Sequence, residues 1–185
     1  MTPIRVKPPS GLPVSLDELK KAANVDFSDD DVLLETYLKA AVEYLDGWNG
    51  ILGRAILEQT YELTINELCG RQIDIPFSPI SDVTLTYTRD GNVCTVSTDD
   101  YRIVATVNGT EIYLNQTEPL LVPLTVTFTT GFGDDAKDVP NAIKVAILLL
   151  ACHWYEHREA TTSTAQTKLP FAVDALIAPY RRICY

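Results

Sequence analysis

The spacing of hydrophobic and polar residues changes twice along the chain. After Asp29, apolar residues recur every three or four positions, which predicts a long amphipathic helix that ends near Gly47 to Gly53. From about Ile56 the period changes to two, as in Tyr61-Glu62-Leu63-Thr64-Ile65, which is typical of half-buried strands. A helical pattern returns after residue 139. The order of elements is therefore helices, strands, helices.

Two helix starts are visible in the first third of the chain. Ser15 is followed three residues later by Glu18, the capping-box pattern, which predicts the start of a short helix. The second, longer helix is preceded by Asp29, Asp30 and Asp31, and negative charge is favoured at a helix N-terminus by the helix dipole. We interpret these three carboxylates as helix-capping residues.

The middle of the chain, about residues 55–131, predicts an antiparallel β module. Asp90-Gly91 and Asn108-Gly109 each lie between alternating runs and suit tight hairpin turns, because Asn, Asp and Gly tolerate positive φ. A last strand from Leu124 to Thr130 alternates apolar residues with threonines. The hairpins imply strands that run in opposite directions.

The second helical region begins at Val139-Pro140 and is expected to reach about Glu159. Its segment from Val145 to Ala151 is apolar on every side, so we expect this helix to be buried on most of its surface. A final short helix is expected after Pro170.

Together these elements predict a single α+β domain over residues 1–185. It consists of a helical bundle around the long buried helix, about residues 140–159, with the β module inserted at about residues 55–131. Residues 1–14 contain four prolines and are expected to form an extended N-terminal arm.

The composition restricts the classes of function. Of 185 residues, 46% are apolar, which is sufficient for a core. The formal net charge of −10 disfavours tight binding to DNA or to anionic membranes. The charge is uneven: residues 15–46 hold nine acids and three bases, and residues 137–185 hold six bases and four acids. The chain thus has an acidic and a mildly basic end.

Cysteine spacing and hydropathy indicate where the protein is made. The four cysteines form no CxxC pair and no dense disulfide pattern, so reduced thiols in a bacterial cytoplasm are expected. The N-terminus has no signal-peptide pattern, and the longest apolar run is too short to cross a bilayer. We expect a protein without membrane partners.

One motif could indicate an enzyme. His153-Trp154-Tyr155-Glu156-His157 matches the HxxEH pattern, in which two histidines on one helix face can bind zinc. A catalytic zinc needs a third protein ligand, and only Glu159 and Asp174 follow as acids. The alternative is a helix end with a packed Trp154 and solvated charges. No nucleophile-base arrangement is recognisable, so we expect no catalytic residue, metal or cofactor.

The C-terminal half carries residues that are familiar as a set. They are Gly131-Phe132-Gly133-Asp134, Val139-Pro140, Ala146-Ile147-Leu148-Leu149-Leu150, His153-Trp154-Tyr155-Glu156 with Arg158-Glu159, and the closing Val173 to Arg182. In this order, and with the acidic helix from Asp29, they resemble tailed-phage head-tail connector (adaptor, head-completion) proteins. Some members of that family are described as possible DNA-packaging proteins. The β module departs from the smaller, mainly helical members.

This resemblance implies a non-enzymatic structural subunit that assembles into a ring, usually of twelve copies. Such a ring links the portal protein to the tail or stopper protein at the head-tail junction of the virion, and DNA passes through its lumen without specific binding. The charge asymmetry suggests contacts between an acidic helix end and a basic C-terminal region of neighbouring copies. The residues that we expect in contacts with partners or between subunits are Asp29, Asp30, Asp31, Arg158, Tyr180, Arg181 and Arg182.

Two alternatives from other functional classes stay open at this point. A DNA-packaging factor would bind the duplex directly and show salt-dependent affinity. A zinc hydrolase using His153 and His157 would contain stoichiometric metal.

Overall fold

The computed structural model describes residues 2–68, 70–106, 109–115, 122–157 and 171–182. The chain divides into two compact units, which we describe separately. The β unit comprises residues 1–10, 58–132 and 183–185, and the helical unit comprises residues 11–57 and 133–182. The described residues form four α-helices and two antiparallel sheets, so the predicted mixed α+β class is confirmed.

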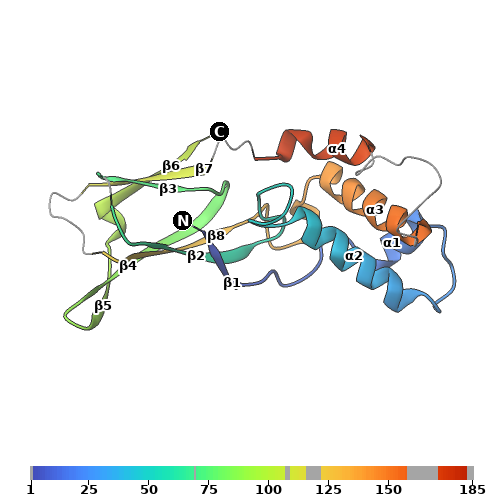
Figure 1. Ribbon diagram of the computed structural model, residues 1–185, viewed down its shortest axis with the longest axis horizontal. Helices are drawn as coiled ribbons and strands as arrows, with labels where there is room; N and C mark the ends of the chain where they lie inside the picture. Colours follow the sequence, from blue (N-terminus) through green and yellow to red (C-terminus); the bar gives the residue numbers. More distant parts are fainter. Residues whose placement is uncertain (1, 69, 107–108, 116–121, 158–170, 183–185) are drawn as a thin grey trace. The chain divides into compact units, whose positions relative to one another are not determined.

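The helical unit is built around its third helix. The four helices are α1 (Leu16–Ala22), α2 (Asp31–Leu45), α3 (Asn141–Glu156) and α4 (Phe171–Ile177). Helix α3 contacts each of the other three, and it lies between α4 and the α1–α2 pair (Figure 1). Two segments that are far apart in the sequence therefore share one core.

The start of α1 confirms the predicted capping box. The Ser15 hydroxyl accepts a hydrogen bond from the Glu18 backbone N–H at 3.2 Å, and the Ser15 backbone N–H donates to the Glu18 carboxylate at 2.8 Å. Leu19, on the next turn, is fully buried. The pair satisfies two backbone donors that a helix start would otherwise leave to water.

The prediction that α3 is buried on most of its surface is wrong. Its buried residues, Ile143, Ala146, Ile147, Leu150 and Ala151, lie along one side. On another side the apolar Val145 and Leu149 are 43% and 40% exposed. An apolar side chain at the surface is common in folded proteins, so hydropathy alone did not locate the covered side. The described helix ends at Glu156, and the predicted end near residue 159 lies outside the described residues.

The β unit contains two antiparallel sheets, which confirms the predicted antiparallel module. The five-stranded sheet has the order β1-β2-β8-β4-β5, and the three-stranded sheet has the order β3-β7-β6 (Figure 1). The strands are β1 (Ile4–Lys7), β2 (Gln59–Ile65), β3 (Gln72–Ile75), β4 (Ile80–Arg89), β5 (Asn92–Thr95), β6 (Tyr101–Thr106), β7 (Gly109–Leu114) and β8 (Leu124–Thr130).

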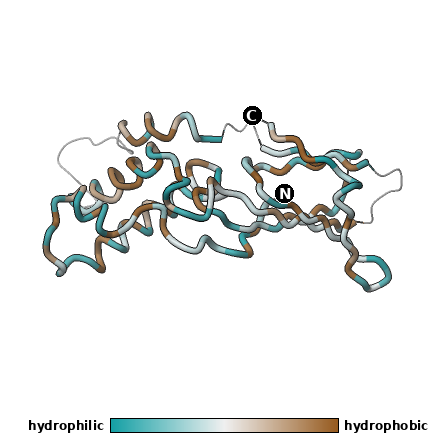
Figure 2. The backbone as a smooth tube through the Cα atoms, turned by 180° about the vertical axis from the view of Figure 1, so that it is seen from behind, coloured by the Kyte–Doolittle hydropathy of each residue, from teal (hydrophilic) through white to brown (hydrophobic). Residues whose placement is uncertain are grey.

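Alternation of side chains explains the core of the β unit. Along β2 and β8 every second residue is buried, and the register places Tyr61 opposite Phe128. Tyr61, Phe77 and Phe128 form an aromatic cluster with ring centroids 4.6 to 5.9 Å apart. The Tyr101 hydroxyl on β6 donates to the Val83 carbonyl on β4 at 2.9 Å, which links the two sheets. Figure 2 shows hydrophobic residues at intervals along both the strands and the helices.

Turn chemistry was predictable, whereas one edge strand was not. Asp90 and Gly91, with φ of 52° and 79°, form the turn between β4 and β5 as expected. Asn108 of the second predicted turn lies outside the described residues. Within the predicted N-terminal arm, Ile4–Lys7 forms β1 and pairs with β2.

No helix in the part of the chain that the structure describes is long and apolar enough to span a membrane.

Candidate functional site

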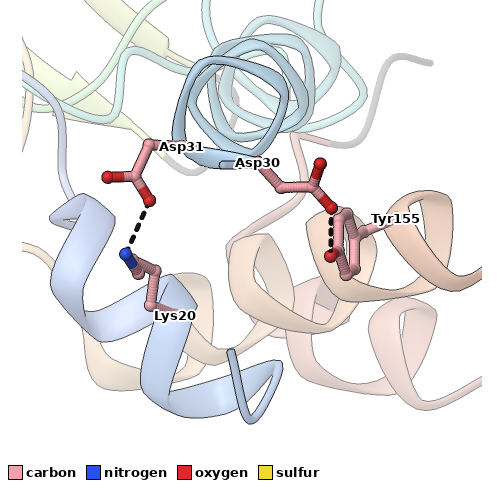
Figure 3. A network of polar contacts seen from close by, with 4 residues as sticks. All are labelled: Lys20, Asp30, Asp31 and Tyr155. Carbon is pink, nitrogen blue, oxygen red and sulfur yellow. Dashed lines mark hydrogen bonds and ion pairs between the residues drawn. The ribbon is translucent and has the colours of Figure 1, made fainter. Parts of the chain in front are cut away.

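The acidic start of α2 is held by contacts to two other helices. The Asp31 carboxylate pairs with the Lys20 ammonium of α1 at 2.6 Å, and the Asp30 carboxylate accepts a hydrogen bond from the Tyr155 hydroxyl of α3 at 2.6 Å (Figure 3). Both bonds involve an ionised group and are therefore stronger than bonds between neutral partners. The first turn of α2 is thus fixed against α1 and α3.

These contacts refine our interpretation of the three carboxylates as capping residues. Asp30 is the N-cap residue of α2, but its side chain makes no capping hydrogen bond. Asp30 and Asp31 instead bind side chains within the helical unit. The positive end of the helix dipole also stabilises their negative charges. Asp29 is exposed. Of the three acids, Asp29 is the exposed one, and Asp30 and Asp31 are half-buried.

The predicted C-terminal contact residues follow α4 directly. Tyr180 ends a short 3-10 helix, Ala178–Tyr180, and Arg181 is exposed. The Arg182 backbone N–H donates to the Leu52 carbonyl at 2.9 Å, and the Arg182 guanidinium lies 5.0 Å from the centroid of the Trp48 ring. Arg158 lies outside the described residues. The structure thus places Arg182 beside the segment that follows α2.

A second arginine, which the sequence did not single out, accompanies Arg182. Burial lowers the pKa of Arg54, and the positive charge of Arg182 lowers it further, because each disfavours the charged form. Arg182 therefore contributes to the electrostatic environment of Arg54. Sequence spacing gave no signal for this pair, since Arg54 and Arg182 lie 128 residues apart in the chain.

The HxxEH motif at the end of α3 brings its two histidines together. The rings of His153 and His157 have centroids 4.6 Å apart, as expected for residues four apart on a helix. Among the described residues, no group of three His, Cys, Asp or Glu side chains is arranged to hold a metal ion. Glu159, one of the two predicted third ligands, lies outside the described residues.

Two of the four cysteines are described, and both are free thiols. Cys94 lies on β5 and Cys152 on α3, and each is half-buried. Burial raises the pKa of the Cys152 thiol, and the nearby Glu156 carboxylate raises it further. Such a thiol is a poor nucleophile at neutral pH, because the reactive thiolate is disfavoured.

Comparison with known proteins decides the family. The model of the phage gp6-like head-tail connector protein family matches residues 13–88 and 102–181, which is most of the chain. The chain belongs to this family. The resemblance recognised from the sequence is therefore confirmed, and membership of the gp6-like head-tail connector family identifies a structural protein of phage-like particles, not an enzyme.

Solved structures with the same fold come from gene transfer agent (GTA) particles. A chain from the neck of an empty GTA particle, computed with C6 symmetry, is 23% identical with a TM-score of 0.81. A chain from the virion of a native GTA particle is 22% identical with a TM-score of 0.80, and one from a native neck computed with C12 symmetry is 22% identical with a TM-score of 0.77. Each comparison covers 100% of this chain and 97% of the other.

At this identity, the three structures establish a shared fold. The search of curated proteins found no match. The β unit departs from the smaller, mainly helical members of the family. It is nevertheless part of the fold that this chain shares with these chains from GTA particles.

Proposed function

We propose that this protein is a ring-forming subunit of the neck of a phage-like particle, located at the head-tail junction of the virion. Membership of the gp6-like head-tail connector family carries this proposal. The similar chains from GTA necks computed with C6 and C12 symmetry support a symmetric ring, and a dodecamer fits both symmetries. Residues 1–185 act as one connector subunit in this proposal, with the β module at about residues 55–131 and the N-terminal arm as its parts.

The ring joins the portal on one side to the tail or stopper protein on the other, and DNA passes through its lumen. The net charge of −10 supports passage without binding, because a protein of this charge repels phosphates. The subunit acts by surface complementarity and makes or breaks no covalent bond.

Contacts between neighbouring copies are proposed to join an acidic and a basic region. A closed ring requires a head-to-tail interface, in which two different surfaces of the subunit meet. Of the proposed contact residues, Asp29, Arg181 and Arg182 are the strongest candidates, since Asp30 and Asp31 already bind Tyr155 and Lys20. Tyr180 and Arg158 belong to the same basic region in sequence.

Electron microscopy of the purified protein, alone and mixed with the portal, tests the proposal. We expect rings, alone or on the portal, with a mass by native mass spectrometry equal to twelve chains. Arg181→Glu should reduce assembly, and Arg89→Glu, an equal charge change at an exposed residue of the β unit, should not. A protein that stays monomeric under both conditions contradicts the proposed ring.

The competing function, a DNA-packaging factor that binds the duplex, makes a different prediction. It requires an electrophoretic shift of duplex DNA at low salt that weakens as salt rises. We expect no shift. A salt-dependent shift at micromolar protein would favour the packaging factor over the connector.

A further inference from the structure

Strand β6 is an exposed edge of the three-stranded sheet (Figure 1). One side of its backbone has a partner, β7, and the other side has no partner strand among the described residues. Its four central side chains are all exposed, and two of them are Ile103 and Val104, at 48% and 37%. An exposed edge strand with apolar side chains is a template on which another chain can add a strand.

The other three edge strands of the described sheets carry features that hinder such pairing. The register of β1 is irregular between Arg5 and Lys7, and β3 and β5 have only four residues each. Strand β6, in contrast, pairs with β7 over six consecutive residues without a shift and contains neither lysine nor proline. Natural proteins protect sheet edges by bulges, charges, prolines and short strands. Of these four edges, β6 is therefore the one best suited to accept a further strand.

The row of side chains that contains Ile103 indicates what a further strand would contribute. Ile73 of β3, Ile112 of β7 and Ile103 of β6 lie side by side across the sheet. Ile73 and Ile112 are 3% and 0% exposed, whereas Ile103 at the edge is 48% exposed. A strand beside β6 would cover Ile103, and burial of apolar surface is favourable.

Charge identifies the edge that fits β6. Arg102 of β6 is exposed and lies over the Tyr113 ring at 4.7 Å. Among the other edge strands described, β3 alone carries an acid, the exposed Asp74. The register places Arg102 and Asp74 on the same face of the sheet. Strand β1 carries Arg5 and Lys7 instead, and like charges on neighbouring strands are destabilising.

We infer that β6 of one copy pairs with β3 of the next copy, so that the three-stranded sheets join into one continuous sheet around the ring. The inference rests on the proposed ring and gives the β module a role in closing it. Strands β3 and β6 are opposite edges of one sheet, so this pairing is head-to-tail and can repeat around a ring. Pairing of β6 with β6 would use the same surface twice and would stop at a dimer.

The direction and alternation of the strands determine which side chains meet. Both β3 and β6 are antiparallel to β7, so the pair between copies is parallel. Because side chains alternate between the faces, Ile103 lies beside Ile73 or Ile75 of the neighbour. On the other face, Arg102 lies within reach of the neighbour's acid, Asp74.

The size of such a sheet is compatible with the proposed ring. Twelve copies with three strands each give thirty-six strands. With about 4.8 Å between strands, the circumference is roughly 170 Å and the diameter at least about 55 Å. A ring of this width leaves room for a DNA duplex in its lumen.

Ile103→Lys tests the pairing at the apolar face. In the single subunit the side chain is half exposed, so a lysine can extend its ammonium group into water and the fold is kept. In the ring the neighbouring strand would bury this charge, so the protein concentration for half-maximal ring formation should rise at least about tenfold. Mass photometry, with portal present if the wild type requires it, gives the ring fraction, and circular dichroism checks the fold.

Ile4→Lys is the matched control. It makes the same change on β1, another edge strand of the β unit, at a side chain that is 67% exposed. This variant should assemble like the wild type. A charge exchange tests the polar face: Asp74→Arg should weaken assembly about threefold, and its combination with Arg102→Asp should restore assembly.

Hydrogen exchange measures the main-chain pairing directly. On ring formation the amides of residues 101–106 should exchange about tenfold more slowly or less, because the outward N–H groups of β6 gain acceptors. The amides of residues 4–7 should exchange at the same rate in subunit and ring.

The outcomes distinguish this inference from the proposed function. If the wild type forms rings and Ile103→Lys forms them at the same concentration, the pairing is wrong and the connector function stands. Equal loss of assembly in Ile4→Lys also overturns the pairing. Slower exchange in β6 that appears only after a tail or stopper protein is added would identify that protein as the occupant of the edge and overturn pairing between copies. If the wild type forms no ring with or without portal, the proposed function itself is contradicted.

Discussion

The hydroxyl group of Tyr155 offers a direct test of how the start of α2 is held against α3. Tyr155→Phe removes the hydrogen bond of 2.6 Å to the Asp30 carboxylate and leaves the aromatic ring in place. A hydrogen bond to an ionised group contributes about 1.5 to 3 kcal/mol. Because Asp30 and Tyr155 are both half-buried, water can partly replace the lost hydroxyl, so we expect the lower end, about 1.5 kcal/mol.

A double-mutant cycle isolates this bond from the other interactions that the two residues make. The cycle compares Asp30→Ala, Tyr155→Phe and the double variant, and its coupling free energy should be about 1 to 1.5 kcal/mol. The chain contains two tryptophans, Trp48 and Trp154, and both lie in the helical unit. Urea unfolding followed by tryptophan fluorescence therefore reports on the unit that the bond stabilises.

Tyr44→Phe provides the matched control for this cycle. The Tyr44 side chain is 40% exposed, and its ring packs edge-to-face on Trp154 with centroids 5.8 Å apart. Loss of its hydroxyl should change the free energy of unfolding by less than about 0.5 kcal/mol. A coupling between Asp30 and Tyr155 below about 0.3 kcal/mol would refute the argument that this bond fixes α2 against α3.

Three further predictions concern other parts of the helical unit. Leu150→Ala, in the buried face of α3, should lower the free energy of unfolding in urea by about 2 to 5 kcal/mol. Val145→Ala, on the exposed side of the same helix, should lower it by less than about 0.5 kcal/mol. Equal effects would contradict the one-sided burial of α3. Glu18→Gln should destabilise the protein by about 0.5 to 1 kcal/mol at pH 7. Hydrogen bonds from Ser15 lower the pKa of Glu18 below its ordinary 4.5. The stabilisation is therefore present above pH 4.5 and is lost as the pH falls through the lower pKa of the folded state. A difference in stability between wild type and variant that persists at pH 2 would argue against this explanation. Cys152, whose pKa is raised by burial, should react with iodoacetamide at pH 8 more slowly than glutathione does, and unfolding in urea should abolish the difference.

Elements specified by local patterns could be predicted from the sequence. The strict alternation of Leu124–Thr130 gave the bounds of β8, because a half-buried strand exposes every second residue. The capping box gave the start of α1, since its hydrogen bonds join residues only three apart. Asp90-Gly91 gave the first hairpin turn because positive φ restricts which residues can occupy it.

Features that depend on distant partners could not be predicted in this way. Ile4–Lys7 stands among prolines and becomes a strand because β2 offers an edge, which no local pattern reveals. The apolar run in α3 contains no polar stripe, so the packing of the other three helices alone determines which side is covered.

The same limit applies to the candidate site. Asp29, Asp30 and Asp31 were recognisable as an acidic cluster at a helix start. Their roles differ, however, because the partners of Asp30 and Asp31 come from other helices. The position of Arg182 beside the segment after α2 depends on the return of the C-terminal segment to that place, which only the fold shows.

The split origin of the helical unit has a consequence for its synthesis on the ribosome. Helices α1 and α2 are translated first, but the surface that buries their apolar residues belongs to α3, and residues 58–132 of the β unit must be made in between. At about 5 to 20 residues per second, the nascent α1 and α2 wait for several seconds with Leu34 and Leu38 unprotected. We expect this interval to be the stage at which the newly made chain is most exposed to aggregation and to chaperones.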